Sequence, residues 1–119
     1  MEKEVRKMIE ENPIAFASVD NMGNPHVIAV ADVKVISENR ILIGDNYMKK
    51  TVDNIKSNRD ISIAVWENSK GSEAEGYQLD GIAEYFEKGK WREMVKKIHR
   101  GCPNKGAIVV EIKNIKKLS

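Results

Sequence analysis

The chain has 119 residues, of which 41% are hydrophobic and 32% charged, a composition typical of a folded globular protein and not of a disordered one. Its length fits a single domain spanning residues 1–119, because domains usually have roughly 100–200 residues. The longest apolar run, Val27 to Ala31, has five residues, whereas a membrane-spanning helix needs about 20. No charged and then apolar leader opens the sequence. We therefore expect a cytoplasmic protein without membrane contact.

The charges are nearly balanced, with 20 basic and 18 acidic residues and a net charge of +2, which implies no particular partner. Residues 88–119 are more basic, with ten basic residues and two acids. Nucleic-acid binding is one interpretation of this segment, but solvated lysines on a helix and an edge strand are the simpler one. We do not expect nucleic acid to be the partner. Cys102 is the only cysteine and cannot form an internal disulfide, which fits a reducing cytoplasm.

The first half of the chain predicts one short helix followed by strands. Val5, Met8 and Ile9 recur at helical spacing, which predicts a helix over residues 2–11. Pro13 ends this helix, because the residue before a proline avoids the helical region. Strands are predicted at residues 14–19, 26–36 and 40–44, and the turn-forming residues 20–24 join the first two.

The second half of the chain predicts two further helices and three further strands. The first helix covers residues 45–58, with Asp45 or Asn46 as its cap, and the second covers residues 89–100. Gly81 lies within a strand and indicates a bulge or a close backbone approach. The strands are predicted at residues 61–66, 77–86 and 107–112, with a polar loop at 67–76, and Ile115 and Leu118 can extend the last strand.

These elements predict a mainly β fold with about three short helices. Consecutive strands joined by tight turns favour an antiparallel sheet. Six twisted strands in so short a chain lose their exposed edges most simply by closing into a barrel. We therefore expect a six-stranded antiparallel barrel, with one helix covering or flanking its open side.

The most informative polar segment is the start of the second predicted helix, where two lysines stand together. The helix dipole is positive at this end, so each lysine there costs about 0.3–1 kcal/mol. Lys49 can pair with Asp53 four residues on, whereas Lys50 faces Asn54 and gains no such partner. A lysine beside the hydroxyl of Thr51 and the free N–H groups of a helix start is suited to bind an anion. The alternative is a solvated lysine pair on a helix face.

Other polar residues give weaker signals. His26 stands at the start of a strand, where a histidine is more often a surface or half-buried residue than a ligand. His99 and Cys102 are three residues apart, but no further cysteine or histidine lies nearby to complete a zinc site. A catalytic pair would also need a third, orienting group. We therefore expect no metal and identify no catalytic residue.

Four stretches together resemble the split-barrel flavoproteins of the pyridoxamine 5'-phosphate oxidase-like family, and within it the short FMN-binding proteins. Each stretch alone is a weak signal, but their order and spacing are fairly specific and the resemblance covers essentially the whole chain. It implies a six-stranded split barrel. The four stretches are residues 23–27, 39–43, 48–55 and 77–83.

The resemblance implies that FMN is the cofactor and that it is held at the interface of a homodimer. Lys50 and Thr51 correspond to the family's phosphate-binding positions. Close relatives often carry asparagine and an aromatic residue where this chain has Ala29 and Ala31. Either side-chain contacts to the flavin ring are lost, or the small residues open space for a substrate or a different flavin. The residues expected to bind the cofactor are Ala29, Val30, Ala31 and Asp32 along the ring, Asn46, Tyr47 and Met48 near the ring and ribityl chain, and Lys49, Lys50 and Thr51 at the helix start.

We therefore expect an FMN-binding flavoprotein that takes part in electron or hydride transfer with a small-molecule redox partner or an electron-transfer protein, since a bound flavin supplies the redox chemistry. One alternative is a deazaflavin-dependent oxidoreductase of the same fold. Another is a flavin- or haem-binding module without turnover. The strand at residues 61–66, with Trp66 at its end, is the expected dimer interface.

Overall fold

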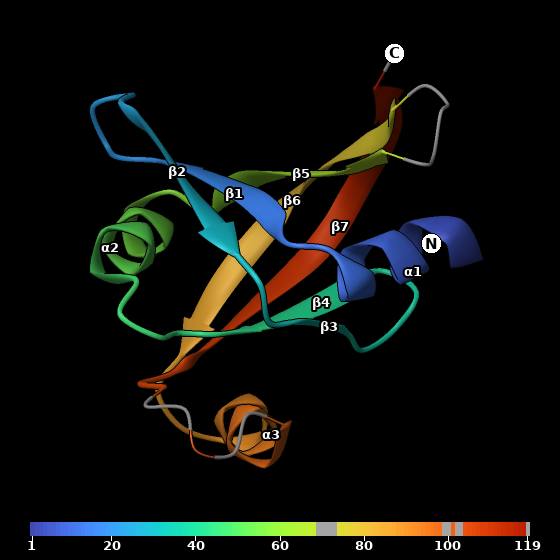
Figure 1. Cartoon of the computed structure of the whole chain (residues 1–119). Helices are drawn as coiled ribbons and strands as arrows, with labels where there is room; N and C mark the ends of the chain where they lie inside the picture. The colour runs from blue at the N-terminus through green and yellow to red at the C-terminus, as the bar shows by residue number, and fades with distance from the viewer. Residues whose placement is uncertain (69–73, 99–100, 102–103, 119) are drawn as a thin grey trace.

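The computed structural model describes residues 1–68, 74–98, 101 and 104–118. Within these residues, seven antiparallel strands form one curled sheet, a half-barrel with three short helices around it (Figure 1). The strands are β1 (Ile14–Val19), β2 (Pro25–Val30), β3 (Val33–Val35), β4 (Arg40–Gly44), β5 (Asp60–Asn68), β6 (Ala74–Phe86) and β7 (Ala107–Leu118), and the helices are α1 (Lys3–Glu11), α2 (Lys49–Ser57) and α3 (Lys90–Ile98). The predicted mainly β split-barrel fold is confirmed.

The count of seven strands instead of six comes from a break in the long strand predicted at residues 26–36. This segment divides at Ala31 and Asp32 into β2 and β3. The sheet order is β2-β1-β5-β6-β7-β4-β3, so the two halves lie at opposite edges of the sheet. The chain therefore joins the two edges covalently at the break. The segment is rich in valine and isoleucine on both sides of Ala31 and Asp32, which is why the sequence pattern predicts one strand.

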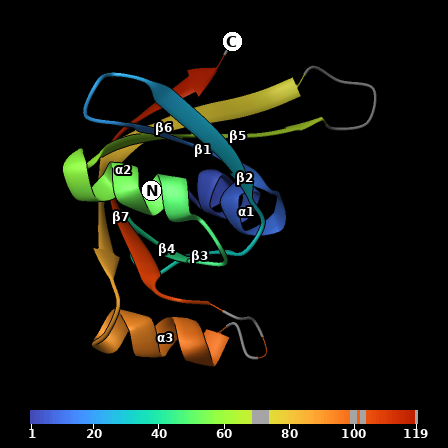
Figure 2. The same cartoon turned by 90° about the vertical axis from the view of Figure 1, so that its left-hand side faces the viewer.

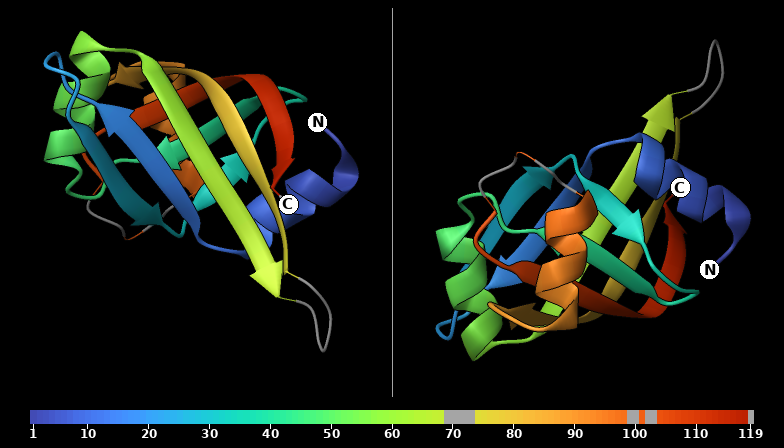
Figure 3. Two further views of the ribbon diagram at one scale, coloured as in Figure 1. Left: turned by 90° about the horizontal axis from the view of Figure 1, so that it is seen from above. Right: turned by 90° about the horizontal axis from the view of Figure 1, so that it is seen from below.

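Alternate side chains of the strands point into the half-barrel and form the core. In β1, Ile14, Phe16 and Ser18 are buried, whereas Ala15, Ala17 and Val19 alternate with them and are half-buried on the outer face. The helices α1 and α2 lie at opposite ends of the half-barrel (Figures 1 and 3). α3 packs on the outside against β4 and β7, where its Val95 meets Leu42 and Val109 in a second cluster (Figure 2). No described helix is long and apolar enough to cross a membrane.

The predicted irregularity at Gly81 is confirmed. The register between β6 and β7 shifts between Asp80 and Gly81. A Cβ at position 81 would collide with the backbone carbonyl of Glu111, so glycine is what lets the two strands approach each other.

The hairpin of β5 and β6 is longer than the sequence-based expectation. β5 and β6 reach into the predicted polar loop and pair Glu67 with Glu75, because ladder hydrogen bonds do not require apolar side chains. α3 ends at Ile98. His99 and Cys102 lie outside the described residues.

Candidate functional site

The helix α2 begins at Lys49, later than predicted, because the residues before it form a tight turn. Oδ1 of Asp45 accepts a hydrogen bond from the N–H of Met48 at 2.8 Å. Tyr47 has a φ of 71°, a left-handed conformation that non-glycine residues rarely adopt. Asp45 therefore closes the turn and does not cap the helix itself. Met48, at the N-cap position, makes no side-chain capping bond, and the first N–H groups of any helix lack partners within it.

The two lysines lie in the first turn of α2, and each has an acidic neighbour. Nζ of Lys49 lies 2.9 Å from Oδ2 of Asp53, and this hydrogen bond is the main cause that lowers the pKa of Asp53. Nζ of Lys50 lies 4.0 Å from Oδ2 of Asp20, in the turn between β1 and β2. Hydrogen bonds from Asn24 are the main cause of the lowered pKa of Asp20. Lys50 is therefore paired more loosely than Lys49.

Two buried side-chain atoms close to this turn lack a hydrogen-bond partner. They are Oγ1 of Thr51, a residue with 1% of its surface exposed, and Oδ1 of Asn46. In the part of the chain that the structure describes, no other buried side-chain oxygen or nitrogen lacks a partner. Leaving a buried polar group unpaired costs about 1–3 kcal/mol, and most such groups in proteins are paired. Asn46 lies before α2 and Thr51 lies in its first turn, and both atoms have almost no accessible surface, so a ligand would reach them only after a small local shift of the turn.

The chemistry of the two atoms constrains such a ligand. The hydroxyl of Thr51 can donate to an anionic oxygen, next to the ammonium of Lys50 and the N–H groups of the helix start. The carbonyl oxygen of Asn46 can only accept, so it needs a hydroxyl or N–H group. A ligand that satisfies both carries an anionic group and, close to it, hydrogen-bond donors.

The predicted residues of the second strand lie at the end of β2 and in the break after it. The side chain of Val30 is buried in the core, so only its backbone can face a ligand. Ala29 is exposed on the outer face, and Ala31 and Asp32 are exposed in the break. β2 is an edge strand that pairs with β1 alone, which leaves backbone N–H and C=O groups open on its other side. α2 packs against β2, so this edge and the α2 turn lie on the same side of the molecule (Figure 2).

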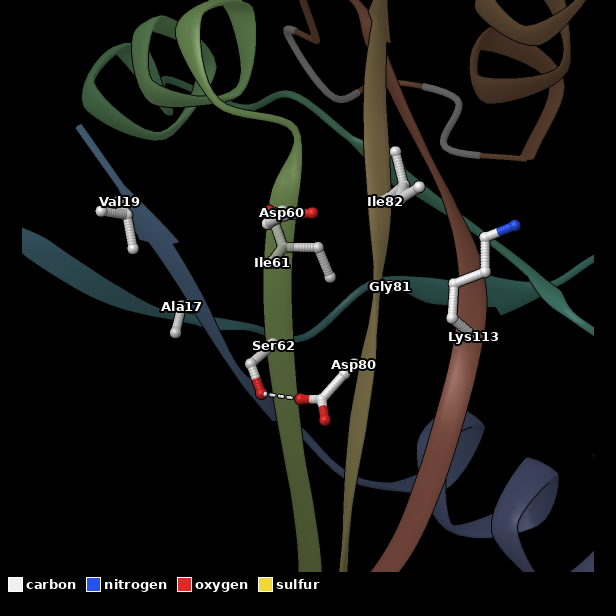
Figure 4. Close-up of a pocket in the computed structure, with 9 residues that line it drawn as sticks. All are labelled: Ala17, Val19, Asp60, Ile61, Ser62, Asp80, Gly81, Ile82 and Lys113. Carbon is white, nitrogen blue, oxygen red and sulfur yellow. Dashed lines mark hydrogen bonds between the residues drawn. The ribbon is translucent and has the colours of Figure 1, made fainter. Parts of the chain in front are cut away.

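A separate hollow of about 470 Å³ lies on the outer face of the sheet (Figure 4). In it, Oγ of Ser62 donates a hydrogen bond to Asp80 at 2.7 Å, and the amide of Gln78 donates to the same oxygen at 2.9 Å. These two bonds, the one from Gln78 first, lower the pKa of Asp80. The hollow is lined by Ala17 and Val19 of β1, Asp60, Ile61 and Ser62 of β5, Asp80, Gly81 and Ile82 of β6, and Lys113 of β7.

The sequence analysis did not identify this hollow, because none of its lining residues belongs to the α2 turn or to β2. The signal that could have found it is the row of small or apolar residues on the outer face of β1, where polar residues are usual.

His26 is half-buried beside Ser18. Among the described residues, no group of three histidine, cysteine, aspartate or glutamate side chains could hold a metal ion.

Comparison with known proteins gives a consistent set of relatives. A sequence model of the family described as pyridoxamine 5'-phosphate oxidase matches residues 1–119. An uncharacterised protein of Methanocaldococcus jannaschii is 30% identical over an alignment of 119 positions. The match covers 95% of this chain and 77% of that protein. HupZ of Group A Streptococcus superposes with a TM-score of 0.90 at 23% identity, over 99% of this chain and 94% of that chain.

Solved structures with the same fold differ in the ligands that their names state. An FMN-binding protein from Syntrophomonas wolfei has a TM-score of 0.81 at 15% identity, over 98% of this chain and 85% of that chain. The heme storage protein HutZ from Vibrio cholerae has a TM-score of 0.71 at 16% identity, and an F420 reductase has one of 0.73 at 15% identity. At such identities the likeness shows the fold and not the ligand.

Proposed function

Because the chain belongs to the pyridoxamine 5'-phosphate oxidase family, we propose that it binds FMN and takes part in electron or hydride transfer. The observation that carries the proposal is the exposed and loosely paired Lys50 in the first turn of α2, next to the unpaired hydroxyl of Thr51. A phosphate group accepts hydrogen bonds from both residues and from the N–H groups of the helix start. The flavin supplies the redox chemistry when it is bound.

The remaining features of the site fit the rest of FMN. The ribityl chain carries hydroxyl groups, which can donate to the unpaired Oδ1 of Asn46. The isoalloxazine ring carries C=O and N–H groups along one edge, which match the open backbone groups of β2, an edge strand. Tyr47 presents an exposed aromatic ring at the same turn. The chain would thus bind the phosphate at α2 and orient the ring along β2.

We also propose that two copies of the chain form a homodimer through the outer face of the sheet. This face holds the hollow shown in Figure 4, and Val27 and Trp66 are exposed over 64% and 49% of their surface. Exposed apolar surface of this kind is typical of interfaces. Light scattering of the flavin-loaded protein at micromolar concentration should give the mass of two chains, and a monomer mass would contradict the proposal. Ala17→Glu, which puts a charge into the hollow, should favour the monomer.

The test of the FMN site is a fluorescence titration of the apo-protein with FMN and with riboflavin, which lacks the phosphate. A charge-assisted hydrogen bond contributes about 1.5–3 kcal/mol, and a tenfold change in affinity corresponds to about 1.4 kcal/mol. Lys50→Ala should therefore weaken FMN binding by about tenfold to a hundredfold and leave riboflavin binding unchanged. An equal loss for both flavins would show that Lys50 does not bind phosphate.

Lys49→Ala is the matched control, because Lys49 already pairs with Asp53 at 2.9 Å and should contribute less to phosphate binding. The visible spectrum of the purified protein tests the cofactor itself. A yellow flavin band that is released on denaturation supports FMN, whereas a haem or deazaflavin spectrum supports one of the alternatives.

A further inference from the structure

The turn before α2 is connected to a distant strand through Asp45. The two oxygens of this buried carboxyl have different partners. Oδ1 accepts from the N–H of Met48 at 2.8 Å, and Oδ2 accepts from the hydroxyl of Tyr85, in β6, at 2.7 Å. Asp45 is 4% exposed. A chain of two hydrogen bonds therefore runs from β6 to the residue that precedes the first turn of α2.

The backbone of Asp45 is held as well. Its N–H donates to the carbonyl of Gly106 at 2.9 Å, and its carbonyl accepts from the N–H of Lys105 at 2.8 Å. A Cβ at position 106 would collide with the hydroxyl of Tyr85, so glycine at this position makes room for the hydroxyl to reach Asp45. Three separate segments thus converge on one carboxyl group: β6, the residues before β7 and the turn before α2.

The hydroxyl of Tyr85 is a permanent donor. Burial is the main cause that raises the pKa of Tyr85 above its usual value of 10, and the hydrogen bond to the Asp45 carboxyl raises it further. The hydroxyl therefore keeps its proton across the ordinary pH range. Asp45 is held in this way directly before Asn46 and Tyr47, which carry the unpaired amide oxygen and the left-handed backbone.

We propose that Tyr85 is a positioning residue for the phosphate-binding turn: through Asp45 and Met48 it holds the first turn of α2 in the orientation that binds phosphate. Tyr85 does not touch the phosphate itself. This inference rests on the proposed function, because it assigns to Tyr85 a role in the same site. Ordered second-layer hydrogen bonds commonly fix the geometry of binding residues in this way.

The test compares FMN with riboflavin in the variant Tyr85→Phe, which removes one hydroxyl and keeps the ring. Loss of one hydrogen bond in the positioning chain should weaken FMN binding by about tenfold. Riboflavin lacks the phosphate but keeps the ribityl contact with Asn46, so it should lose less affinity and the ratio of the two affinities should fall. Thermal unfolding of the apo-protein measures the loss of stability separately. A purely structural role would weaken both flavins equally and leave their ratio at the wild-type value.

Three further variants extend the test. Tyr77→Phe removes a hydroxyl from another partly buried tyrosine of β6 and should leave the FMN-to-riboflavin ratio unchanged. Asp45→Asn keeps an acceptor for Met48 and a polar partner for Tyr85, so it should retain most of the preference for FMN. Asp45→Ala loses both bonds and should lose more of the preference than Tyr85→Phe.

The possible failures can be told apart. If wild-type protein binds FMN and riboflavin equally, the proposed phosphate site is wrong. If wild-type protein prefers FMN and Tyr85→Phe keeps that preference, the phosphate site stands and the role of Tyr85 is wrong. Should Tyr85→Phe fail to fold, Gly106→Ala gives the same test, because its methyl group displaces the hydroxyl of Tyr85. A folded Gly106→Ala variant with an unchanged preference would overturn the inference.

Discussion

The helices α1 and α2 have the same length of nine residues, and neither has a side-chain N-cap, yet they differ at their starts. The third residue of each helix is buried, but it is Val5 in α1 and Thr51 in α2. The first turn of each helix has two basic residues, but only the first turn of α1 also has an acid, Glu4, which the helix dipole favours. The start of α1 buries an apolar side chain, whereas the start of α2 buries a hydroxyl and has no acid, and it is the end at which we propose that phosphate binds.

The unpaired hydroxyl is a property of the start of α2 and not of its whole buried face. Asn54, one turn further along α2, is also buried, but its amide donates to the hydroxyl of Ser18 at 3.0 Å. The core thus supplies a polar partner in the middle of the helix and none at its start. The bond to Ser18 explains the buried amide of Asn54, whereas none of the described residues gives the hydroxyl of Thr51 a hydrogen-bond partner.

The largest expected effects are on stability, and they test whether α1 acts only in packing. Ile9→Ala in α1 should lower the free energy of unfolding by about 2–5 kcal/mol, because it removes a fully buried side chain and leaves a cavity. Ile55→Ala in α2 should have a similar effect on stability. Urea unfolding measures both. If folded Ile9→Ala protein loses its preference for FMN over riboflavin, α1 does not act in packing alone.

A reciprocal exchange at the third helix position sharpens the comparison. Val5→Thr buries a hydroxyl without a partner and should lower the free energy of unfolding of the apo-protein by about 1–3 kcal/mol. Thr51→Val removes such a hydroxyl, so it should leave the stability of the apo-protein unchanged or raise it, while FMN binding weakens by about tenfold. Urea unfolding and flavin titration give the two readouts. If Thr51→Val destabilises the apo-protein, Thr51 has a partner within the chain.

The smallest expected effect concerns the exposed pair of Lys49 and Asp53. The hydrogen bond from Lys49 lowers the pKa of Asp53 below 3.8. A carboxyl whose pKa is lower in the folded state contributes stability above the unfolded value, and that stability is lost as the pH falls through the folded value. Lys49→Ala should return the pKa of Asp53 toward 3.8, as an NMR titration of its carboxyl carbon would show. An unchanged pKa would mean that Lys49 is not held by Asp53 in solution.

Local spacing in the sequence was sufficient to predict the helices and strands and part of the candidate site. Side-chain periodicity predicts the three helices and six strands, of which one divides into β2 and β3 in the structure. The four-residue spacing of Lys49 and Asp53 predicts their pair, which the structure shows at 2.9 Å. The lysines and Thr51 at a helix start also follow from the chain order alone. These features depend on neighbours within about one turn of helix, which is the range over which sequence patterns carry information.

Only the tertiary structure decided which distant groups meet. Asp20 reaches Lys50 from a hairpin 30 residues earlier, Tyr85 reaches Asp45 from a strand 40 residues later, and the break at Ala31 and Asp32 appears only once β2 and β3 lie at opposite edges of the sheet. Whether the hydroxyl of Thr51 finds a partner depends likewise on every segment packed around it. Such contacts are set by how the sheet curls and by which side chains fill its interior, and neither is encoded in local periodicity.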